Sequence, residues 1–469
     1  MLPDPIRTTL GADPTHRACA LNGYAFQQDA LRTFNGWQYA CFYSAFDGAP
    51  EPLYVHLSRR KLPHGLWETV VFEDYAQTVD DGHNTVQLGI CPGDGTIHLS
   101  YDHHCDVLRY RYSKVGAATS PEQADWSAAL FTPTLSSLPG LESSAEMTDL
   151  LSYITYPRFV TAGQDLLFTF RTGKAGLGDD HLCVYSATPS PNITNTTPAN
   201  DNETEEASRG TYRFLGTHLK GVRNNPYIHG LDASPDGQRL YTTWVYREFV
   251  HYPGWDDPAD TKHKQQAGPN SAANNRDICY AWSSDGGTRW DNGKGEVIAD
   301  IGRGESILPT SPGIVAFPIS TGSGLINQEA QAVDAEGGVH VLNRDNLDGG
   351  VQRWKHYYLS SHGGMWTQRA VPYVDGVYGG KRGQIAVSRA GDLYFVLPHH
   401  VDPVLTILRA SKASQFAAYE IVWQGEGFPP TEPLVDKARL SNDNVLSVFT
   451  RARIGSGPGV DVVVLDFQL

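Results

Sequence analysis

The segment Gly237-Gln-Arg-Leu-Tyr-Thr-Thr-Trp-Val-Tyr-Arg247 begins with a turn residue and continues as a run of β-branched and aromatic residues. Such a run, bounded by glycine, predicts a β-strand. The same pattern recurs six more times, in the segments that begin at Gly36, Gly95, Asp165, Gly338, Gly391 and Asn444. No helical periodicity separates these segments, which indicates an all-β protein.

The number of these segments predicts the architecture. Seven of them in 469 residues correspond to about 67 residues each, enough for a four-stranded sheet with generous loops. Repeats of this size favour a propeller over a solenoid. We therefore predict a seven-bladed β-propeller that forms a single domain over residues 1–469, with a pair of β-sandwiches as the alternative.

One turn supports the propeller. The run Ser283-Ser-Asp285-Gly-Gly287-Thr-Arg-Trp290 nearly matches the Asp-box turn SxDxGxTW, except that Arg289 replaces the threonine before the tryptophan. In that turn the aspartate binds backbone amides and the tryptophan packs between sheets. We therefore expect a structural role for this run.

The composition excludes several classes of function. The chain has 47 glycines and 29 prolines but only three methionines, which argues against long helical bundles. The net charge of −15 argues against a nucleic-acid partner, although a few arginines in one cleft can still attract an anion. No segment is long enough to span a membrane, so we expect no membrane partner either.

The cysteines and sequons bear on the compartment. The six cysteines show no CxxC spacing, so we expect buried thiols, with one or two disulfides as the alternative. Three N-glycosylation sequons, at Asn192, Asn195 and Asn202, predict a glycosylated loop inserted at about residues 187–210 of a secreted protein. The first five residues do not resemble a signal peptide, and we expect that one was removed before this sequence begins.

Polar residues concentrate in the second predicted blade. The run Asp81-Gly-His83-Asn84 precedes one strand, and Asp102-His103-His104 ends the next. A hairpin would bring these runs together, and an aspartate beside a histidine, here Asp102, can fix its tautomer. We expect a functional role for His83. Strand alternation places His103 and His104 on opposite faces, so we expect only one of them to share a site with His83.

A histidine cluster also raises the question of a metal. Zinc would need three or four converging ligands, which His83, Asp102 and His104 could supply. No HxH or HExxH spacing supports such a site. Catalytic zinc is therefore the minor alternative.

Blades three to five add tyrosine, arginine and amide side chains. Arg171 ends an otherwise apolar strand, where a charge requires a partner, and Tyr156 lies at the start of the preceding strand. Similar positions in the next blades are occupied by Arg223, Tyr227, Arg247 and Gln328. An ordinary ion pair with the neighbouring Glu248 is the simpler interpretation of Arg247.

This set of histidine, tyrosine and arginine suits β-elimination beside a uronate carboxylate. An arginine can neutralise the carboxylate, because a guanidinium binds it through two hydrogen bonds. A neutral histidine or tyrosine can then take the C5 proton, and a second one can protonate the departing oxygen. A glycosidase would instead use two carboxylates, for which Asp102 and Glu329 are candidates, and would leave the other residues without a role.

The runs that carry these residues resemble those of the seven-bladed BNR-repeat polysaccharide lyases. The run Ile97-His-Leu-Ser-Tyr-Asp102-His103-His104 is the most distinctive. The resemblance extends through residues 83–85, 108–111, 155–159, 167–173, 244–248, 274–280 and 327–334. This superfamily contains ulvan lyases and L-rhamnosyl-α-1,4-D-glucuronate lyases.

The resemblance implies roles for individual residues. His83 and His104 would be the acid/base histidines, Tyr156 the tyrosine that moves protons, and Arg171 the arginine that neutralises the carboxylate. Residues assigned to substrate binding are Asn84, His103, Arg223, Tyr227, Arg247 and Gln328. The chemistry would need no cofactor. Some members bind a structural calcium, whose ligands the sequence does not identify.

We therefore expect a secreted, monomeric lyase that acts on an acidic polysaccharide. Its predicted substrate is the L-rhamnose-α-1,4-D-glucuronate linkage of gum arabic or arabinogalactan side chains, with rhamnose and an unsaturated glucuronate end as products. An ulvan-type endo lyase is the second interpretation. A rhamnosidase, which hydrolyses the linkage, and a carbohydrate-binding propeller without activity are further alternatives, and a sialidase is weaker because no set of three arginines is evident.

Overall fold

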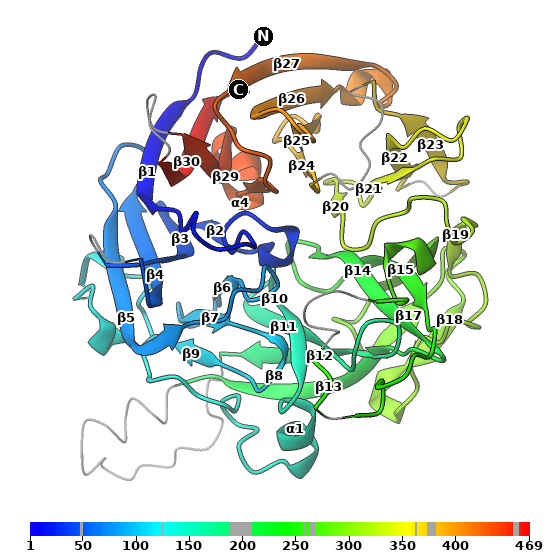
Figure 1. Cartoon of the computed structure of the whole chain (residues 1–469), viewed down its shortest axis with the longest axis horizontal. Helices are drawn as coiled ribbons and strands as arrows, with labels where there is room; N and C mark the ends of the chain where they lie inside the picture. Colours follow the sequence, from blue (N-terminus) through cyan, green and yellow to red (C-terminus); the bar gives the residue numbers. More distant parts are fainter. Residues whose placement is uncertain are drawn as a thin grey trace.

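The structure is a computed structural model that describes residues 1–46, 50–123, 125–187, 209–257, 259–261, 268–361, 364–372, 381–453 and 459–469. Seven antiparallel sheets surround a central axis like the blades of a propeller (Figure 1). The predicted all-β, seven-bladed β-propeller is therefore confirmed. The three sequons and most of the predicted loop at 187–210 lie outside the described residues.

The first three blades follow one another along the chain. Blade one contains β2 (Leu31–Phe34), β3 (Trp37–Ser44), β4 (Leu53–Lys61) and β5 (Glu68–Gln77). Blade two contains β6 (Val86–Ile90), β7 (Ile97–Tyr101) and β9 (Tyr110–Tyr112). Blade three contains β10 (Ile154–Ala162), β11 (Asp165–Thr172), β12 (Asp180–Ser186) and β13 (Thr211–Leu219), and β8 (His104–Asp106) pairs with β10.

Blade four is the largest sheet. It contains β14 (Asn224–Ala233), β15 (Leu240–Glu248), β16 (Asn275–Ser283), β17 (Arg289–Asp291), β18 (Val297–Asp300) and β19 (Val315–Phe317). Blade five contains β20 (Ala330–Val333), β21 (Val339–Asp345), β22 (Arg353–Leu359) and β23 (Thr367–Ala370). Blade six contains β24 (Gln384–Val387), β25 (Leu393–Pro398), β26 (Val404–Ala410) and β27 (Tyr419–Glu426).

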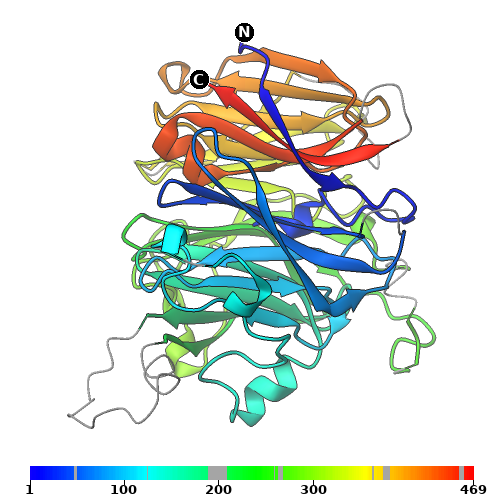
Figure 2. The same ribbon diagram turned by 90° about the vertical axis from the view of Figure 1, so that its left-hand side faces the viewer.

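Blade seven joins the two ends of the chain. It contains β28 (Leu434–Val435), β29 (Val445–Arg453), β30 (Val460–Gln468) and β1 (Ile6–Ala12). The first strand pairs with the last, with Ile6 opposite Asp466, and Figure 2 shows the blue β1 lying along the red C-terminal strand. This pairing joins the two ends of the chain in one sheet and so closes the ring of seven blades.

Helices are few and short in the described part of the chain. The α-helices are α1 (Ala145–Leu150) and α4 (Lys437–Asp443). The 3₁₀ helices are η1 (Ala25–Gln27), η2 (Pro121–Gln123), η3 (Ala128–Leu130), η4 (Ala272–Asn274), η5 (Ile301–Arg303) and η6 (Lys412–Ser414). In this part of the chain, no helix has the length and apolarity that a membrane span requires.

The seven segments recognised in the sequence form one structural class. They are the second strands of the seven blades, namely β3, β7, β11, β15, β21, β25 and β29. Strands β3, β21 and β25 are buried along their whole length. A strand covered on both faces by neighbouring blades needs a nearly continuous apolar run, which is why these strands had the clearest sequence signal.

The Asp-box turn connects β16 to β17 and has the expected structural role. Asp285 Oδ1 accepts hydrogen bonds from the backbone N–H groups of Thr288 and Arg289, at 3.1 and 2.9 Å. The fully buried Trp290 donates from Nε1 to Gly287 O at 2.9 Å, and its ring lies 5.5 Å from that of His218 on blade three. The turn therefore fixes the packing between blades three and four.

All six cysteines are free thiols, which excludes the alternative of one or two disulfides. Five of them are buried, and Cys19 is half-buried. The isolated buried thiols expected from their spacing are thus what the structure contains.

Candidate active site

Each blade contributes one residue near the start of its innermost strand to a common mouth of the propeller. The innermost strands that Figure 1 labels lie nearest its centre. Residues near the starts of these strands contact one another across neighbouring blades, as Phe26 contacts His83 and Tyr156 contacts Tyr227. Strands that pair antiparallel with them end at that mouth, and so the last residues of β11 and β15 join the site. The seven residues at the strand starts are Phe26, His83, Tyr156, Tyr227, Gln328, Arg382 and Glu432.

A single buried carboxylate joins the two candidate histidines. Asp81 accepts a hydrogen bond from His83 Nδ1 at Oδ1 and one from His104 Nδ1 at Oδ2, both at 2.6 Å. The two imidazole rings stack with their centroids 3.9 Å apart. His83 is the accessible member of the pair, with 30% of its side chain exposed against 7% for His104.

Electrostatics at this cluster follow from burial and from the hydrogen bonds. Burial alone would raise the pKa of Asp81, but the hydrogen bonds from His104 and His83 hold that pKa far below its usual range. Burial, together with the charge of His83, lowers the pKa of His104 to about 3. His104 is therefore a neutral imidazole at ordinary pH.

The expected partnership of Asp102 with a histidine is wrong. The Asp102 carboxylate accepts hydrogen bonds from Tyr75 Oη, from Gln77 Nε2 at 3.1 Å and from Asn84 Nδ2 at 2.7 Å. Asp102 has a φ of +65°, and this left-handed turn after β7 directs its side chain away from the histidine pair. Asn84 thus supports a buried network behind the site.

His103 and His104 point to different partners, as strand alternation predicts. His103 is 1% exposed, and its Nε2 accepts a hydrogen bond from the backbone N–H of Arg109 at 2.8 Å. Burial lowers the pKa of His103 well below its usual value. The structure therefore places His103 outside the mouth that contains His83.

Tyr156 lies across the mouth from the histidine pair because β10 bulges there. The β10–β11 register shifts between Thr155 and Arg158, and Tyr156 has a φ of +56°. A bulge of this kind redirects a side chain, and strained backbone of this type is common at functional sites. The Tyr156 ring lies 5.8 Å from that of His83, and burial raises the pKa of its phenol above the usual value.

Arg171 is a buried cation that faces no carboxylate in the described structure. Its side chain donates to Tyr227 Oη, to Thr155 Oγ1 and to Gly173 O, each at 3.2 Å. Its guanidinium lies 4.8 Å from the centroid of the Tyr156 ring, and the residue is only 2% exposed. A buried charge held only by neutral groups is costly unless a ligand neutralises it.

Arg247 is the second such cation. It donates to Asn275 Oδ1 at 2.9 Å, to Asn327 Oδ1 at 2.8 Å and to Tyr227 Oη at 3.3 Å. The simpler interpretation of Arg247, an ion pair with Glu248, is wrong, because the Glu248 carboxylate pairs with Arg276. Tyr227 therefore lies between two guanidinium groups whose charges no described carboxylate neutralises.

The remaining sequence candidates lie at the edge of this group. Gln328 is 2% exposed, has a φ of +55° and accepts a hydrogen bond from Asn327 Nδ2 at 3.1 Å. Arg223, also with a φ of +55°, is exposed, and within the described structure its side chain forms no hydrogen bond or ion pair with the cluster around Arg171. The structure thus places Gln328 next to the Arg247 contacts and Arg223 on the rim.

Sequence reasoning missed three groups at the mouth. Phe26 stacks on the outer face of His83, with ring centroids 4.7 Å apart. Arg382 lies 4.7 Å from the Phe26 ring and forms an ion pair with Glu432 at 3.0 Å. Asp81 stands in the polar run Asp81-Gly-His83-Asn84, but only the conformation of the loop shows that it binds both histidines. Phe26, Arg382 and Glu432 could have been found only by collecting the residues that precede each innermost strand.

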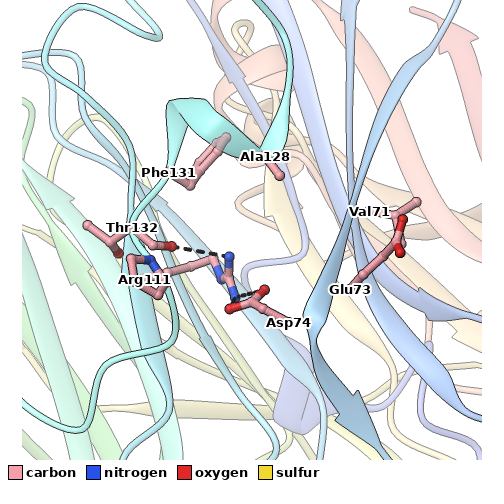
Figure 3. A pocket seen from close by; sticks show the side chains of 8 residues that line it. Val71, Glu73, Asp74, Arg111, Ala128, Phe131 and Thr132 are labelled. Atoms are coloured by element: carbon pink, nitrogen blue, oxygen red, sulfur yellow. Dashed lines mark hydrogen bonds and ion pairs between the residues drawn. The ribbon is translucent and has the colours of Figure 1, made fainter.

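A surface pocket on blades one and two shows how differently a neutralised arginine is arranged. Figure 3 shows Arg111 facing Asp74 there, with Nη2 within 2.7 and 2.8 Å of the two carboxylate oxygens. Arg111 also donates to Thr132 O at 3.2 Å. Because Asp74 neutralises the charge of Arg111, this pocket offers no uncompensated positive charge to an anion.

One group of three side chains in the described part of the chain could hold a metal ion, and it is Asp81, His83 and His104. The third ligand is therefore Asp81 and not the Asp102 considered from the sequence. Calcium prefers an all-oxygen set of six to eight ligands, so this group does not suit a structural calcium. Zinc accepts two imidazoles and a carboxylate, but both Nδ1 atoms here already donate to Asp81.

The BNR repeat-containing family matches residues 37–373. The chain belongs to the BNR repeat-containing family. Among curated relatives of this family member, a long-isoform ulvan lyase of Pseudoalteromonas sp. (strain PLSV) is 23% identical over 71% of this chain and 33% of its own length. A short-isoform ulvan lyase of Alteromonas sp. (strain LOR) is 26% identical over 48% of each chain. This chain thus spans about a third of the length of the long-isoform relatives.

Solved structures show the same fold. The polysaccharide lyase Uly1 superposes with a TM-score of 0.67 at 16% identity, covering 100% of this chain and 99% of that chain. An ulvan lyase of polysaccharide lyase family 25, bound to a GlcA(1-4)Rha3S segment, superposes with a TM-score of 0.58 at 14% identity, covering 99% and 96% of the two chains. At these identities the likeness concerns the fold of this BNR-repeat protein.

Proposed function

We propose that this protein is a polysaccharide lyase that cleaves a glycosidic bond at O4 of a uronate by β-elimination. The observation that carries this proposal is the pair of buried arginines, Arg171 and Arg247, which no described carboxylate neutralises. A uronate carboxylate supplies the missing negative charge. Its neutralisation is also what makes the adjacent C5 proton acidic enough to remove.

The proton-transfer groups lie beside these arginines. His83 Nδ1 is held by Asp81, so Nε2 of the neutral ring is an acceptor, and His83 is the exposed member of the pair. We assign to His83 the removal of the C5 proton. The Tyr156 hydroxyl has no hydrogen-bond partner in the described structure, and as a neutral phenol it can protonate the departing O4.

The reaction balances with these groups alone. The C5–H bond breaks, its electron pair forms the C4–C5 double bond, and the C4–O4 bond breaks. His83 gains the proton from C5, and O4 gains the proton of Tyr156. Arg171 stabilises the charge that develops on the carboxylate as C5 loses its proton.

The two carboxylates considered for a hydrolase, Glu329 and Asp102, are not presented at the mouth, and the Glu432 carboxylate there is paired with Arg382 at 3.0 Å. Glu329 is fully buried and pairs with Arg344 at 3.2 Å. Asp102 is 2% exposed and bonded within its own network. These contacts favour elimination over a two-carboxylate glycosidase.

For the substrate, we propose the L-rhamnose-α-1,4-D-glucuronate linkage of gum arabic or arabinogalactan side chains. We also propose that the protein is secreted and meets such polymers outside the cell. The net charge of −15 is unfavourable for a long sulfated chain. The names of the curated relatives favour a second candidate, endo cleavage of ulvan.

One assay separates these possibilities. The protein is incubated with gum arabic and with ulvan side by side, and the ultraviolet absorbance and mass of the products are measured. Rhamnose release with an unsaturated glucuronate end supports the first substrate, and unsaturated oligosaccharides from ulvan support the second. Binding without any product would mean a carbohydrate-binding propeller, and a saturated glucuronate end would mean a rhamnosidase.

A further inference from the structure

We propose that Phe249, Tyr252 and Trp255 form an aromatic platform that binds the neutral sugar attached to C1 of the uronate. This inference rests on the proposed lyase function for the position of the uronate, and it adds a binding subsite beyond the cleaved bond. None of the three rings takes part in proton transfer, so we expect the platform to act on binding alone.

The platform lies on a loop at the mouth of the propeller. Near its end β15 carries Arg247, whose Nε donates to the side chain of Asn275, the first residue of β16, at 2.9 Å. The chain that connects these two strands therefore leaves and re-enters blade four beside one of the two uncompensated cations. Any sugar bound on this loop is within reach of a uronate held by that cation.

Hydrogen bonds hold the start of this loop on the rim. The side chain of Asn270, which is 0% exposed, accepts from the backbone N–H of Val250 at 2.7 Å and donates to Val250 O at 2.9 Å. Asn270 O accepts a hydrogen bond from Arg247 at 3.3 Å. The backbone N–H of Phe249 donates to Arg223 O at 3.1 Å. The loop and the arginine site are thus one connected structure.

The three rings pack on one another and keep part of their surface exposed. The centroid of the Trp255 ring lies 4.7 Å from that of Phe249 and 5.7 Å from that of Tyr252. All three side chains are half-buried. Lys174, on the β11–β12 loop of blade three, donates from Nζ to Trp255 O at 2.9 Å and lies 5.2 Å from the centroid of its ring. A partly exposed aromatic cluster beside an active site is typical of a ligand-binding surface.

The place of the platform decides which sugar it takes. His83 and Tyr156, which act at C5 and O4 of the uronate, lie on blades two and three, whereas the platform lies beyond Arg247 on blade four. The sugar that departs with O4 therefore leaves on the side of Tyr156. C1 is across the pyranose ring from C4, so the sugar attached to C1 extends toward the platform.

The charges around the platform favour a neutral sugar. Asp256 and Asp257 follow Trp255 directly and are exposed. These two carboxylates outnumber the Lys174 ammonium and repel a sulfate or a second uronate. The apolar face of a neutral pyranose can stack on an aromatic ring, whose face attracts polarised C–H groups. The galactose of an arabinogalactan is such a sugar.

The first experiment compares two substrates. One is rhamnosyl-glucuronate with only a methyl group on C1, and the other carries galactose at that position. We expect kcat/KM to be about 10-fold higher for the galactoside, mainly through a lower KM, because stacking strengthens ground-state and transition-state binding alike. Trp255→Ala should remove this preference and leave turnover of the methyl glycoside unchanged. Equal values for the two substrates in the unmodified protein, or an equal loss on both in Trp255→Ala, would overturn the proposal.

Trp126→Ala is the matched control. Trp126 is also half-buried beside a cation, with its ring centroid 4.5 Å from the Arg59 guanidinium, but it donates to Glu68 O on the outer strand of blade one. We expect this variant to keep the preference for the galactoside, and its loss there would refute a specific role of the platform. If Trp255→Ala does not fold, Tyr252→Ala tests the same claim, since it should reduce the preference, and an unchanged preference would count against the platform.

A binding measurement separates this inference from the proposed function. Saturated glucuronosyl-galactose has no sugar on O4 and cannot be cleaved, so calorimetric titration can compare its Kd with that of methyl glucuronoside. We expect about 10-fold tighter binding of the galactose-containing ligand, lost in Trp255→Ala. Equal Kd values would overturn the platform. The expected difference in a protein that cleaves no uronate polysaccharide would refute the proposed function and leave the platform standing.

Discussion

Replacing Arg171 with methionine should abolish activity without weakening the fold. The guanidinium can donate two charge-assisted hydrogen bonds to a uronate carboxylate, worth about 1.5–3 kcal/mol each. Their loss as charge develops corresponds to a fall in kcat/KM of roughly 10²–10⁴-fold. The activity is measured from the ultraviolet absorbance of the unsaturated uronate, at matched protein concentrations.

The effect on stability comes from two opposing terms. The three hydrogen bonds that Arg171 donates to oxygen atoms of the protein, each 3.2 Å long, stabilise the fold by about 1 kcal/mol each. Burying a cation without a carboxylate costs several kcal/mol, so its removal offsets their loss. We expect the free energy of unfolding of Arg171→Met, from urea denaturation, to equal that of the parent or exceed it by up to about 2 kcal/mol.

Arg344→Met is the matched control for stability. Arg344 is equally buried, but it pairs with Glu329, whose side chain is 0% exposed. Its removal leaves a buried carboxylate without its ion-pair partner and should cost about 3–5 kcal/mol. The reasoning fails if Arg171→Met is destabilised as much as Arg344→Met, or if it retains near-normal turnover.

Three further predictions concern the acid group, the pH dependence of stability and the Asp-box turn. Tyr156→Phe should lower kcat by about 10²–10⁴-fold with little change in KM, because only the transferred proton is lost; an unchanged kcat would show that another group protonates O4. The free energy of unfolding should fall steeply from pH 6 to pH 4, because burial lowers the pKa of four histidines to about 3 or about 4, so that the unfolded chain binds their protons more tightly than the folded chain. Each of these histidines lowers the free energy of unfolding by about 1.4 kcal/mol for each pH unit. The four are His98, His104, His181 and His229. Asp29, whose pKa burial raises to about 6, opposes one of the four, and urea midpoints that do not change over this range would contradict the prediction. Trp290→Ala should lower the free energy of unfolding by about 3–5 kcal/mol while KM is unaffected, and an effect on KM alone would contradict the structural role.

The fold was predictable because its signal is local. Each second strand is buried on both faces, so its apolar run and its turn can be read from about ten residues without knowledge of the rest of the chain. The closing pair β1–β30 was not predicted, since residues 6–12 carry no continuous apolar run. Their partner strand lies at the other end of the chain.

The site was predictable only in part, because its decisive contacts depend on loop conformation. Strand alternation separated His103 from His104 correctly, but it could not show that Asp81, and not Asp102, binds the histidines. That choice depends on the left-handed turn at Asp102. Adjacent charges in the sequence were equally misleading for Arg247, because consecutive residues of a strand point to opposite faces.

The central claim is that the chain cleaves its substrate by elimination, and isotope labelling tests it most directly. A rhamnosyl-glucuronate oligosaccharide is incubated with the protein in water enriched in oxygen-18, and the products are measured by mass spectrometry. The account predicts a glucuronate end that is lighter by one water than the hydrolysis product and absorbs in the ultraviolet, and released rhamnose that carries no oxygen-18 in samples taken before its anomeric hydroxyl exchanges with water. A saturated glucuronate end, formed together with rhamnose that carries oxygen-18 at its anomeric hydroxyl, would contradict it.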